Sequence, residues 1–441
     1  MRFDYSKEPR RDILCIDVKS FYASVECVQL GLDPLKAMLV VMSNAENAGG
    51  LILSASPMAK EKLGLSNVMR KWDLPDHPEL RIVPPRMQFY IDENMKINNI
   101  YKQYVATEDI HAYSIDESFL DITASKKLFG KNAYELAETI MAHIKKETGL
   151  AVTIGVGDNP LLAKVAMDVA AKHNDSYIAE WRYEQVPETL WKIKSLTEMW
   201  GINSRTAKRL EKLNVHSVYE LAHTNEYALK DEFGVIGLQL YAHAWGIDRT
   251  RLADSYIPEE KSLNNNQILP RDYRFQREIE TVLQELTDQV AARLRQQDAQ
   301  TQCVALYIGY SSWYRKQGNK GFHHQMKIPA TNRSKLLKEY ILEIFREHWT
   351  GIEVRRIGVS FSKLTYTNAI QLDLFHNPQA PVNDHKLDNL IDAIRKKYGF
   401  TAILHANSLL SGGTAVSRAS LIGGHAGGMD GLRSEYDAKK Y

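Results

Sequence analysis

Residues 14–26 read LCIDVKSFYASVE and place one carboxylate, Asp17, within an otherwise apolar segment. Residues 13–18 are predicted to form a buried strand, and residues 21–30 a helix that ends before the Gly31-Leu32-Asp33-Pro34 break. An unpaired carboxylate in a buried strand is strongly destabilising unless a cation compensates it. Asp17 is therefore expected to have a cationic partner.

A second acidic signal follows much later, in Ser114-Ile115-Asp116-Glu117-Ser118, within a hairpin predicted over residues 110–122. If Asp17, Asp116 and Glu117 converge, their combined charge favours a divalent cation. Mg²⁺ held by carboxylate oxygens and a phosphate is the best match. For Asp116 and Glu117 taken alone, an acidic hairpin tip without an ion is the alternative.

These two motifs resemble the acidic motifs of the Y-family translesion DNA polymerases. Residues 17–26 are similar to the first motif and residues 114–117 to the second, with room between them for the fingers insertion of that family. The resemblance covers roughly residues 10 to 375. It is greatest to the Gram-positive relatives of the SOS mutagenesis polymerase subunit.

Composition is compatible with this resemblance. A chain of 441 residues suggests about three domains. The net charge is only +2, but residues 271–363 hold 16 Lys and Arg against 10 Asp and Glu. This local positive charge suits a surface that follows the phosphates of a nucleic acid. A solvated lysine-rich face is the alternative. The three cysteines lack CxxC spacing and no apolar run is long enough for a membrane span, so a cytoplasmic protein without membrane contact is expected.

The resemblance implies a multidomain α+β fold of the right-hand polymerase type. The turn-rich stretch 262–267 is interpreted as linker, and the Gly/Ser/Ala-rich stretch 411–428 as flexible. The expected parts are palm (1–34 and 81–185), small fingers (35–80), helix-hairpin-helix thumb (186–258), linker (259–267), little finger (268–365) and C-terminal tail (366–441).

The resemblance also assigns roles to the acidic residues. Asp17 and Asp116 would bridge two Mg²⁺ ions, and Glu117 would bind the ion nearest the primer terminus. The Val18 carbonyl would complete the ion on the triphosphate. Such an enzyme takes primer-template DNA and deoxynucleoside triphosphates as substrates.

Residues that follow Asp17 are expected to bind the incoming nucleotide. Ser20, Phe21 and Tyr22 open the predicted helix, whose backbone amides can point at phosphate oxygens. By resemblance Tyr22 is the steric gate that excludes a 2′-hydroxyl. A pair of core aromatics at a strand-helix junction is the alternative, and it suits Phe21 better than Tyr22.

The fingers depart from the family pattern, because Met58 and Glu61 stand where many relatives carry a Tyr and an Arg. Lys60 is the substitute cation proposed for the triphosphate. Residues 155–164 resemble the family's next motif, and the helix that follows runs on to Lys172. By resemblance Lys172 is the lysine that binds phosphate, although it is offset by one residue from the commonest family spacing. Lys164, on the preceding apolar helix, is expected to be structural, with a packed stem and a solvated ammonium.

Two further segments predict contacts with DNA and protein partners. The thumb-like hairpin would present Gly201, Asn203, Lys208, Arg209 and Lys212 to a phosphate, with Ser204 as the expected helix N-cap; an ordinary αα corner is the alternative. Gln371-Leu372-Asp373-Leu374-Phe375 resembles the pentapeptide that docks bacterial replication factors on the beta sliding clamp. In it, Gln371, Leu372, Leu374 and Phe375 would make the contacts. Relatives also contact a recombinase filament or an accessory subunit through the tail.

The predicted function is template-directed, low-fidelity DNA synthesis past lesions in DNA repair and SOS mutagenesis. A catalytically weak DNA-binding and clamp-docking regulator is the main alternative, motivated by the altered fingers cations. The three carboxylates of Asp17, Asp116 and Glu117 argue against this alternative, because a pure binding module would have no reason to retain acids that destabilise its fold. A palm-type nucleotidyl transferase without a template, such as a cyclase, is disfavoured by the thumb-like hairpin and the basic last domain.

Overall fold

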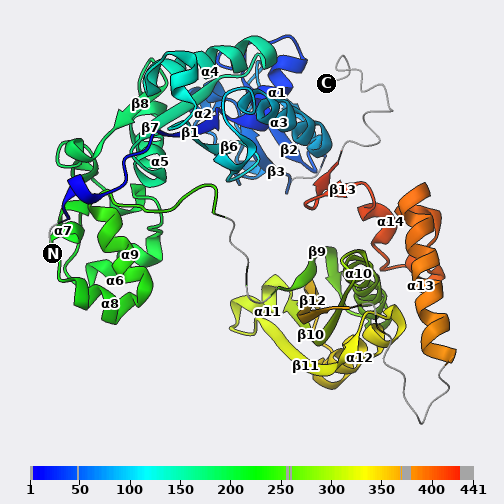
Figure 1. The fold of residues 1–441 in the computed structure, drawn as a ribbon. Coiled ribbons are helices and arrows are strands. Elements are labelled where there is room, and N and C mark those ends of the chain that lie inside the picture. Colours follow the sequence, from blue (N-terminus) through cyan, green and yellow to red (C-terminus); the bar gives the residue numbers. More distant parts are fainter. Residues whose placement is uncertain are drawn as a thin grey trace. The chain divides into compact units, whose positions relative to one another are not determined.

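The computed structural model describes residues 3–46, 49–254, 258, 261–367, 369 and 379–427 (Figure 1). The chain divides into two compact units. The first comprises residues 1–255 and 425–441, and the second residues 256–424.

The centre of the first unit is a five-stranded sheet in the order β5-β6-β1-β7-β8. In this sheet β1 runs antiparallel to both neighbours, which sets Asp17 directly opposite Glu117. Side chains alternate along a strand, so Asp17 points to the same face as Ile13 and Cys15, which pack against helix α5. The elements are β1 (Ile13–Val18), α1 (Phe21–Gln29), α3 (Met87–Tyr101), β5 (Ile110–Ala112), β6 (Glu117–Asp121), α4 (Ala133–Thr148), β7 (Val152–Gly157), α5 (Pro160–Val169) and β8 (Ile178–Trp181).

A small lobe with its own core is inserted between α1 and α3. Its sheet has the order β3-β2-β4 and is covered by α2. The elements are β2 (Leu39–Ser43), β3 (Leu51–Ala55), α2 (Pro57–Leu63) and β4 (Arg81–Val83). Since β4 pairs in parallel with β2, the lobe extends to Val83, and the expectation that the palm resumes at residue 81 is corrected.

A helical subdomain follows β8 and shares a core with α5. It contains α6 (Ser204–Glu211), α7 (Val218–His223), α8 (Glu226–Phe233) and α9 (Val235–Ala244). The N-cap of α6 is Asn203 rather than the expected Ser204, because the Asn203 side chain accepts hydrogen bonds from the backbone amides of Arg205 and Thr206, each at 2.9 Å. Ser217 caps α7, because its side chain accepts a hydrogen bond from the backbone amide of Glu220 at 3.1 Å.

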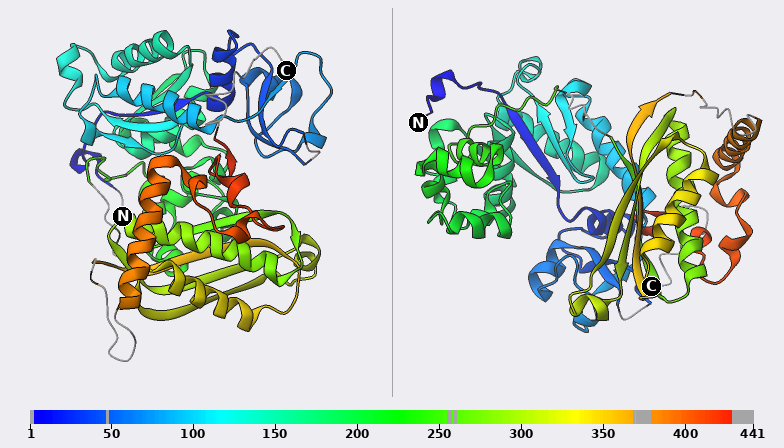
Figure 2. Two further views of the ribbon diagram at one scale, coloured as in Figure 1. Left: turned by 90° about the vertical axis from the view of Figure 1, so that its right-hand side faces the viewer. Right: turned by 90° about the horizontal axis from the view of Figure 1, so that it is seen from below.

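The second unit is a four-stranded antiparallel sheet, β11-β10-β12-β9, whose core lies between the sheet and helices α10 and α12 (Figure 2). The elements are β9 (Leu263–Tyr273), α10 (Gln276–Gln296), β10 (Ala299–Tyr310), α11 (Ser312–Lys316), β11 (Gly321–Thr331), α12 (Ser334–His348) and β12 (Val354–Tyr366). Residues 263–267 are therefore strand and not the expected linker. They pair with Ile357 to Phe361 of β12, which satisfies the backbone groups that face this neighbouring strand.

The C-terminal part of the second unit packs on its helices. Helix α13 (Gln379–Tyr398) is joined to α10 by Arg295, which contacts Asp392 at 2.6 Å and Asp388 at 3.3 Å. Short elements follow: α14 (Ala415–Arg418) and β13 (Leu421–Ile422) in the second unit, and then β14 (His425–Ala426), which belongs to the first unit. The stretch that starts at residue 411 was expected to be flexible, but its first residues are anchored. Tyr273 donates to the Gly412 carbonyl at 2.9 Å, and the amide of buried Thr414 donates to Glu285 at 2.9 Å.

Candidate active site

The acidic residues predicted from the sequence meet at one end of the five-stranded sheet. Asp17 and Glu117 are cross-strand partners in β1 and β6, and the Val18 amide donates to the Asp116 carbonyl at 2.9 Å. The Asp116 carboxylate is partly buried and accepts a hydrogen bond from the Ser114 hydroxyl at 2.6 Å. The backbone therefore brings all three residues together, as expected.

The environment of Asp17 strongly shifts the pKa of its carboxylate. Its side chain is 18% exposed, and burial, reinforced by the neighbouring Asp116 and Glu117 carboxylates, raises its pKa to about 6. Lys172 and Lys164 act in the opposite direction. The lysines thus compensate Asp17 only in part, and the site retains an attraction for further cations.

Glu117 is held by protein groups on both of its carboxylate oxygens. Lys164 Nζ lies 2.8 Å from one oxygen, and Cys15 Sγ lies 3.2 Å from the other. The Lys164 side chain is only 9% exposed, so the expectation of a solvated ammonium is corrected. Burial opposes the charge of this ammonium, but contacts with Glu117 and Asp168 outweigh it and raise the Lys164 pKa.

The oxygen-rich donors at this site suit a hard divalent cation. Asp17 and Val18 adjoin Asp116 at the sheet end through the bond from the Val18 amide to the Asp116 carbonyl, and the incompletely neutralised Asp17 supplies the charge. Among the residues that the structure describes, however, no three Asp, Glu, His or Cys side chains are grouped closely enough to hold a metal ion together.

Lys172 lies where the sequence predicts a phosphate lysine. Its ammonium is 2.8 Å from Asp168 Oδ1 and 3.6 Å from Asp17 Oδ2. The one-residue offset from the commonest spacing has a local explanation, because α5 ends at Val169 and a 3-10 turn follows, in which Ala171 is fully buried. A lysine at position 171 would point into the core, whereas position 172 faces Asp17.

Lys60 also belongs to the electrostatic environment of the acids. Partial desolvation lowers its pKa, while the Asp17 and Asp116 carboxylates raise it and Lys172 lowers it further. Sequence reasoning missed Lys19, whose pKa responds to burial, to Asp17 and to the same two lysines, and whose ammonium lies 4.0 Å from the centre of the Tyr177 ring. Its position two residues after Asp17 was the available signal.

The start of α1 holds Ser20, Phe21 and Tyr22, the residues predicted to bind the incoming nucleotide. Ser20, the N-cap residue, adopts a left-handed conformation (φ 49°) and makes no side-chain capping bond, so its hydroxyl is not used to cap the helix. Phe21 is buried, as the core alternative anticipated. The partly buried Tyr22 stacks on Tyr90 at a centroid separation of 4.5 Å, and burial together with the Asp116 carboxylate raises its pKa.

Thumb residues predicted to contact DNA divide into two groups. Lys208 and Lys212 are exposed on or directly after α6, near the exposed Gly201 and Asn203. Arg209, in contrast, is engaged with α8: its Nε lies 2.7 Å from Glu232 and its guanidinium stacks 4.2 Å from the centre of the Phe233 ring. Arg209 therefore already has protein partners.

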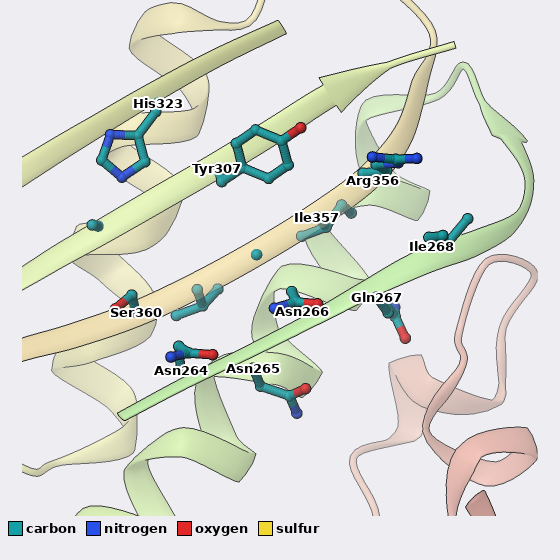
Figure 3. Close-up of a pocket in the computed structure, with 13 residues that line it drawn as sticks. Asn264, Asn265, Asn266, Gln267, Ile268, Tyr307, His323, Arg356, Ile357 and Ser360 are labelled. Atoms are coloured by element: carbon teal, nitrogen blue, oxygen red, sulfur yellow. The ribbon is translucent and has the colours of Figure 1, made fainter. Parts of the chain in front are cut away.

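The second unit presents a polar hollow of about 610 Å³ on its sheet (Figure 3). Tyr307 of β10, His323 of β11 and Arg356 of β12 line it together with residues 264–268 of β9. Burial alternates along β12: Ile357, Val359 and Phe361 are buried in the core, and the intervening Gly358 and Ser360 are among the residues that line the hollow. The clamp-like pentapeptide 371–375 lies outside the described residues.

In the described part of the chain, no helix is both long and apolar enough to cross a membrane. The cysteines Cys15, Cys27 and Cys303 are buried free thiols.

Comparisons with known proteins agree on one family. Residues 16–168 match the impB/mucB/samB family, and residues 260–374 match the C-terminal domain of the same family. The chain is 38% identical to the protein UvrX of Bacillus subtilis strain 168, whose name links it to UV-damage repair, over 96% of this chain and 99% of UvrX. It is 35% identical to DNA polymerase IV 2 of the same organism, over 94% of this chain and 98% of that protein. A solved Y-family DNA polymerase chimera of Dbh and Dpo4 has a similar fold, with a TM-score of 0.64 and 22% identity over 81% of this chain and 100% of the chimera.

Proposed function

Because this chain belongs to the impB/mucB/samB family and is a Y-family translesion DNA polymerase acting in DNA repair, we propose that Asp17, Asp116 and Glu117 form its catalytic centre. The observation that carries the proposal is the desolvated Asp17 carboxylate. Its pKa of about 6, beside two further acids and several lysines, marks a site arranged for cations and phosphates.

Two Mg²⁺ ions are the cofactor that this donor set suits. Asp17, Asp116 and the Val18 carbonyl would hold them, with Glu117 joining on the primer side after it exchanges Lys164 for metal. Bound there, Mg²⁺ would make the primer 3′-hydroxyl more acidic and neutralise the leaving pyrophosphate. The remaining tasks fall to side chains and backbone of this chain.

The triphosphate would be bound by lysines that share the electrostatic environment of Asp17. Lys172 and Lys60 are the proposed phosphate ligands, and Lys19 is added as a third cation close to the same carboxylate. The strained turn at Ser20 and the amides of Phe21 and Tyr22 at the start of α1 offer hydrogen-bond donors to phosphate oxygens.

Tyr22 is proposed to select deoxyribonucleotides by excluding a 2′-hydroxyl. Its ring is held from behind by Tyr90, whose hydroxyl donates to Glu26 at 2.7 Å. Glu26 in turn forms a bidentate ion pair with Arg86, at 2.9 and 2.6 Å. A gate must resist displacement, and this chain of contacts supplies the rigidity.

Primer-template DNA is the proposed macromolecular ligand of both units. In the first unit Lys208 and Lys212, with Gly201 and Asn203, would contact backbone phosphates. In the second unit the polar hollow over β9–β12 would lie against the duplex, with Arg356 supplying charge. We further propose that residues 371–375 dock on the beta sliding clamp, and that the tail can contact a recombinase filament or accessory subunit. Three buried free thiols suit the reducing cytoplasm that we propose as its location.

The catalytic assignment is tested by primer extension with purified protein, Mg²⁺ and deoxynucleotides. The informative variant is Asp116→Asn with Glu117→Gln, because alanine at 117 would leave the buried Lys164 without its partner. We expect extension to fall about a thousandfold, with a smaller loss of unfolding free energy than alanine at position 117 would cause, because the glutamine amide oxygen can still accept a hydrogen bond from Lys164 and Asp168 still pairs with it. Glu108→Ala, which removes an exposed acid just before β5, is the matched control. Equal extension by the double variant and the unchanged protein would refute the assignment.

A further inference from the structure

Helix α5 and the turn after it carry a row of alternating charges that faces the acidic residues. Lys164, Asp168 and Lys172 follow one another at intervals of four residues, so they lie on one face of the segment. Asp168 contacts both lysines: its Oδ2 is 3.0 Å from Lys164 Nζ, and its Oδ1 is 2.8 Å from Lys172 Nζ.

Each lysine of this row also contacts a proposed catalytic acid. Lys164 Nζ lies 2.8 Å from Glu117, and Lys172 Nζ lies 3.6 Å from Asp17. The ion pairs therefore form one continuous sequence, Glu117–Lys164–Asp168–Lys172–Asp17. Its two ends are cross-strand neighbours in β6 and β1. Asp168 is the central member, and it contacts both lysines of the row.

This arrangement differs from ordinary charge pairing on a helix surface. The exposed pair Lys36–Asp33 has side chains that are 82% and 44% exposed, and such pairs contribute little to stability. In the row, Lys164 is 9% exposed and both Asp168 and Lys172 are 33% exposed. Positions of buried charges are fixed by their partners, so the loss of one partner moves the others.

We propose that Asp168 is a positioning residue. By pairing with both Lys164 and Lys172, it limits how closely the two ammonium groups pair with the catalytic acids Glu117 and Asp17. Without Asp168, both ammonium groups would turn fully to Glu117 and Asp17 and compete there with divalent metal. Lys172 would also be withdrawn from the triphosphate. With Asp168 present, Lys172 stays paired with Asp168 at 2.8 Å and can exchange its 3.6 Å contact with Asp17 for a contact with a phosphate oxygen.

This inference rests on the proposed function, and its test begins with Asp168→Asn. Mn²⁺ binding without nucleotide, measured by electron paramagnetic resonance of the free ion, should weaken about fivefold. In primer extension the KM for deoxynucleotide should rise about fivefold with a smaller change in kcat. Asp168→Glu, which keeps the carboxylate, should restore both values to within about twofold. Glu180→Gln is the matched control, because Glu180 is also 33% exposed and pairs with Arg182 at 2.7 Å.

A double-mutant cycle distinguishes positioning from a general effect of charge. If Asp168 acts through Lys172, then adding Asp168→Asn to Lys172→Ala should raise the KM by less than about twofold. An undiminished effect in that background, or a change in thermal unfolding temperature alone, would overturn the inference. Should Asp168→Asn fail to fold, Asp168→Ser removes the same contacts with a smaller side chain. Failure of the unchanged protein to extend a primer would instead refute the proposed function.

Discussion

At the scale of single residues, Asp17 lowers the stability of the metal-free fold and at the same time favours the binding of a cation. Its carboxylate has an ordinary pKa of 3.8, which the fold raises to about 6, chiefly by burial. The folded protein therefore binds a proton more tightly than the unfolded chain does. Asp17 destabilises the metal-free fold above pH 6, and this cost disappears as the pH falls from 6 towards 4.

We expect Asp17→Asn to stabilise the metal-free protein at pH 8 by about 1 to 2 kcal/mol, because it removes a desolvated charge. The measurement is thermal or urea unfolding in EDTA across pH 4 to 8. The advantage of the variant should shrink as the pH falls through 6. Added Mg²⁺ should stabilise the unchanged protein more than the variant. A difference that stays constant with pH would contradict the raised pKa.

The residues of the site were only partly predictable from the sequence. Asp17, Asp116 and Glu117 were found because each belongs to a recognisable motif. The four-residue spacing of Lys164, Asp168 and Lys172 was visible, but the sequence does not say which face of α5 lies against β1. For the same reason Lys164 was expected to be solvated, whereas the fold turns its ammonium onto Glu117.

At the scale of elements, the sequence marks both ends of helix α4 clearly. Helix α4 begins with a capping box of Asn132 and Glu135 and ends at Gly149 in a left-handed conformation. Strands β4 and β9 were missed because their pairing partners lie far away in the sequence. In β9 the polar run Asn264 to Asn266 looks like a loop in the sequence, and only pairing with β12 makes it a strand.

In the hairpin around α6, Lys208 is predicted to contribute to DNA binding through its charge, and Arg209 to stability through its contacts within the protein. Lys208→Ala should weaken primer-template binding about threefold to tenfold and reduce its salt dependence, because an exposed lysine neutralises a phosphate. Arg209→Ala should instead lower stability by about 0.5 to 1 kcal/mol, since it loses Glu232 and the Phe233 ring.

Fluorescence anisotropy with labelled DNA at several salt concentrations, alongside thermal unfolding, measures both effects of the hairpin variants. Each substitution serves as the control for the other, because both remove one positive charge from the same helix. If Arg209→Ala reduced DNA affinity as strongly as Lys208→Ala, then Arg209 would leave Glu232 to contact DNA. The proposed division of roles would then be wrong.

At the scale of the whole molecule, the proposed clamp motif occupies the connection between two anchored elements. β12 ends at Tyr366, and α13 begins at Gln379 and is tied to α10 by Arg295. Removing residues 371–375 would shorten this connection and could pull α13 from its place. Substitution is therefore the sharper test, with Leu374→Ala and Phe375→Ala combined in one variant.

Without these two apolar anchors, clamp-stimulated synthesis should be lost, while unstimulated primer extension should stay within about twofold, because a few buried side chains carry most of the energy of such contacts. Leu387→Ala with Leu390→Ala is the matched control, since both leucines lie on α13 and are 57% exposed. Primer extension with and without loaded clamp provides the measurement, together with direct binding to the clamp. Persistent stimulation would remove residues 371–375 from the docking role, and parallel loss of both activities would indicate damage to the fold.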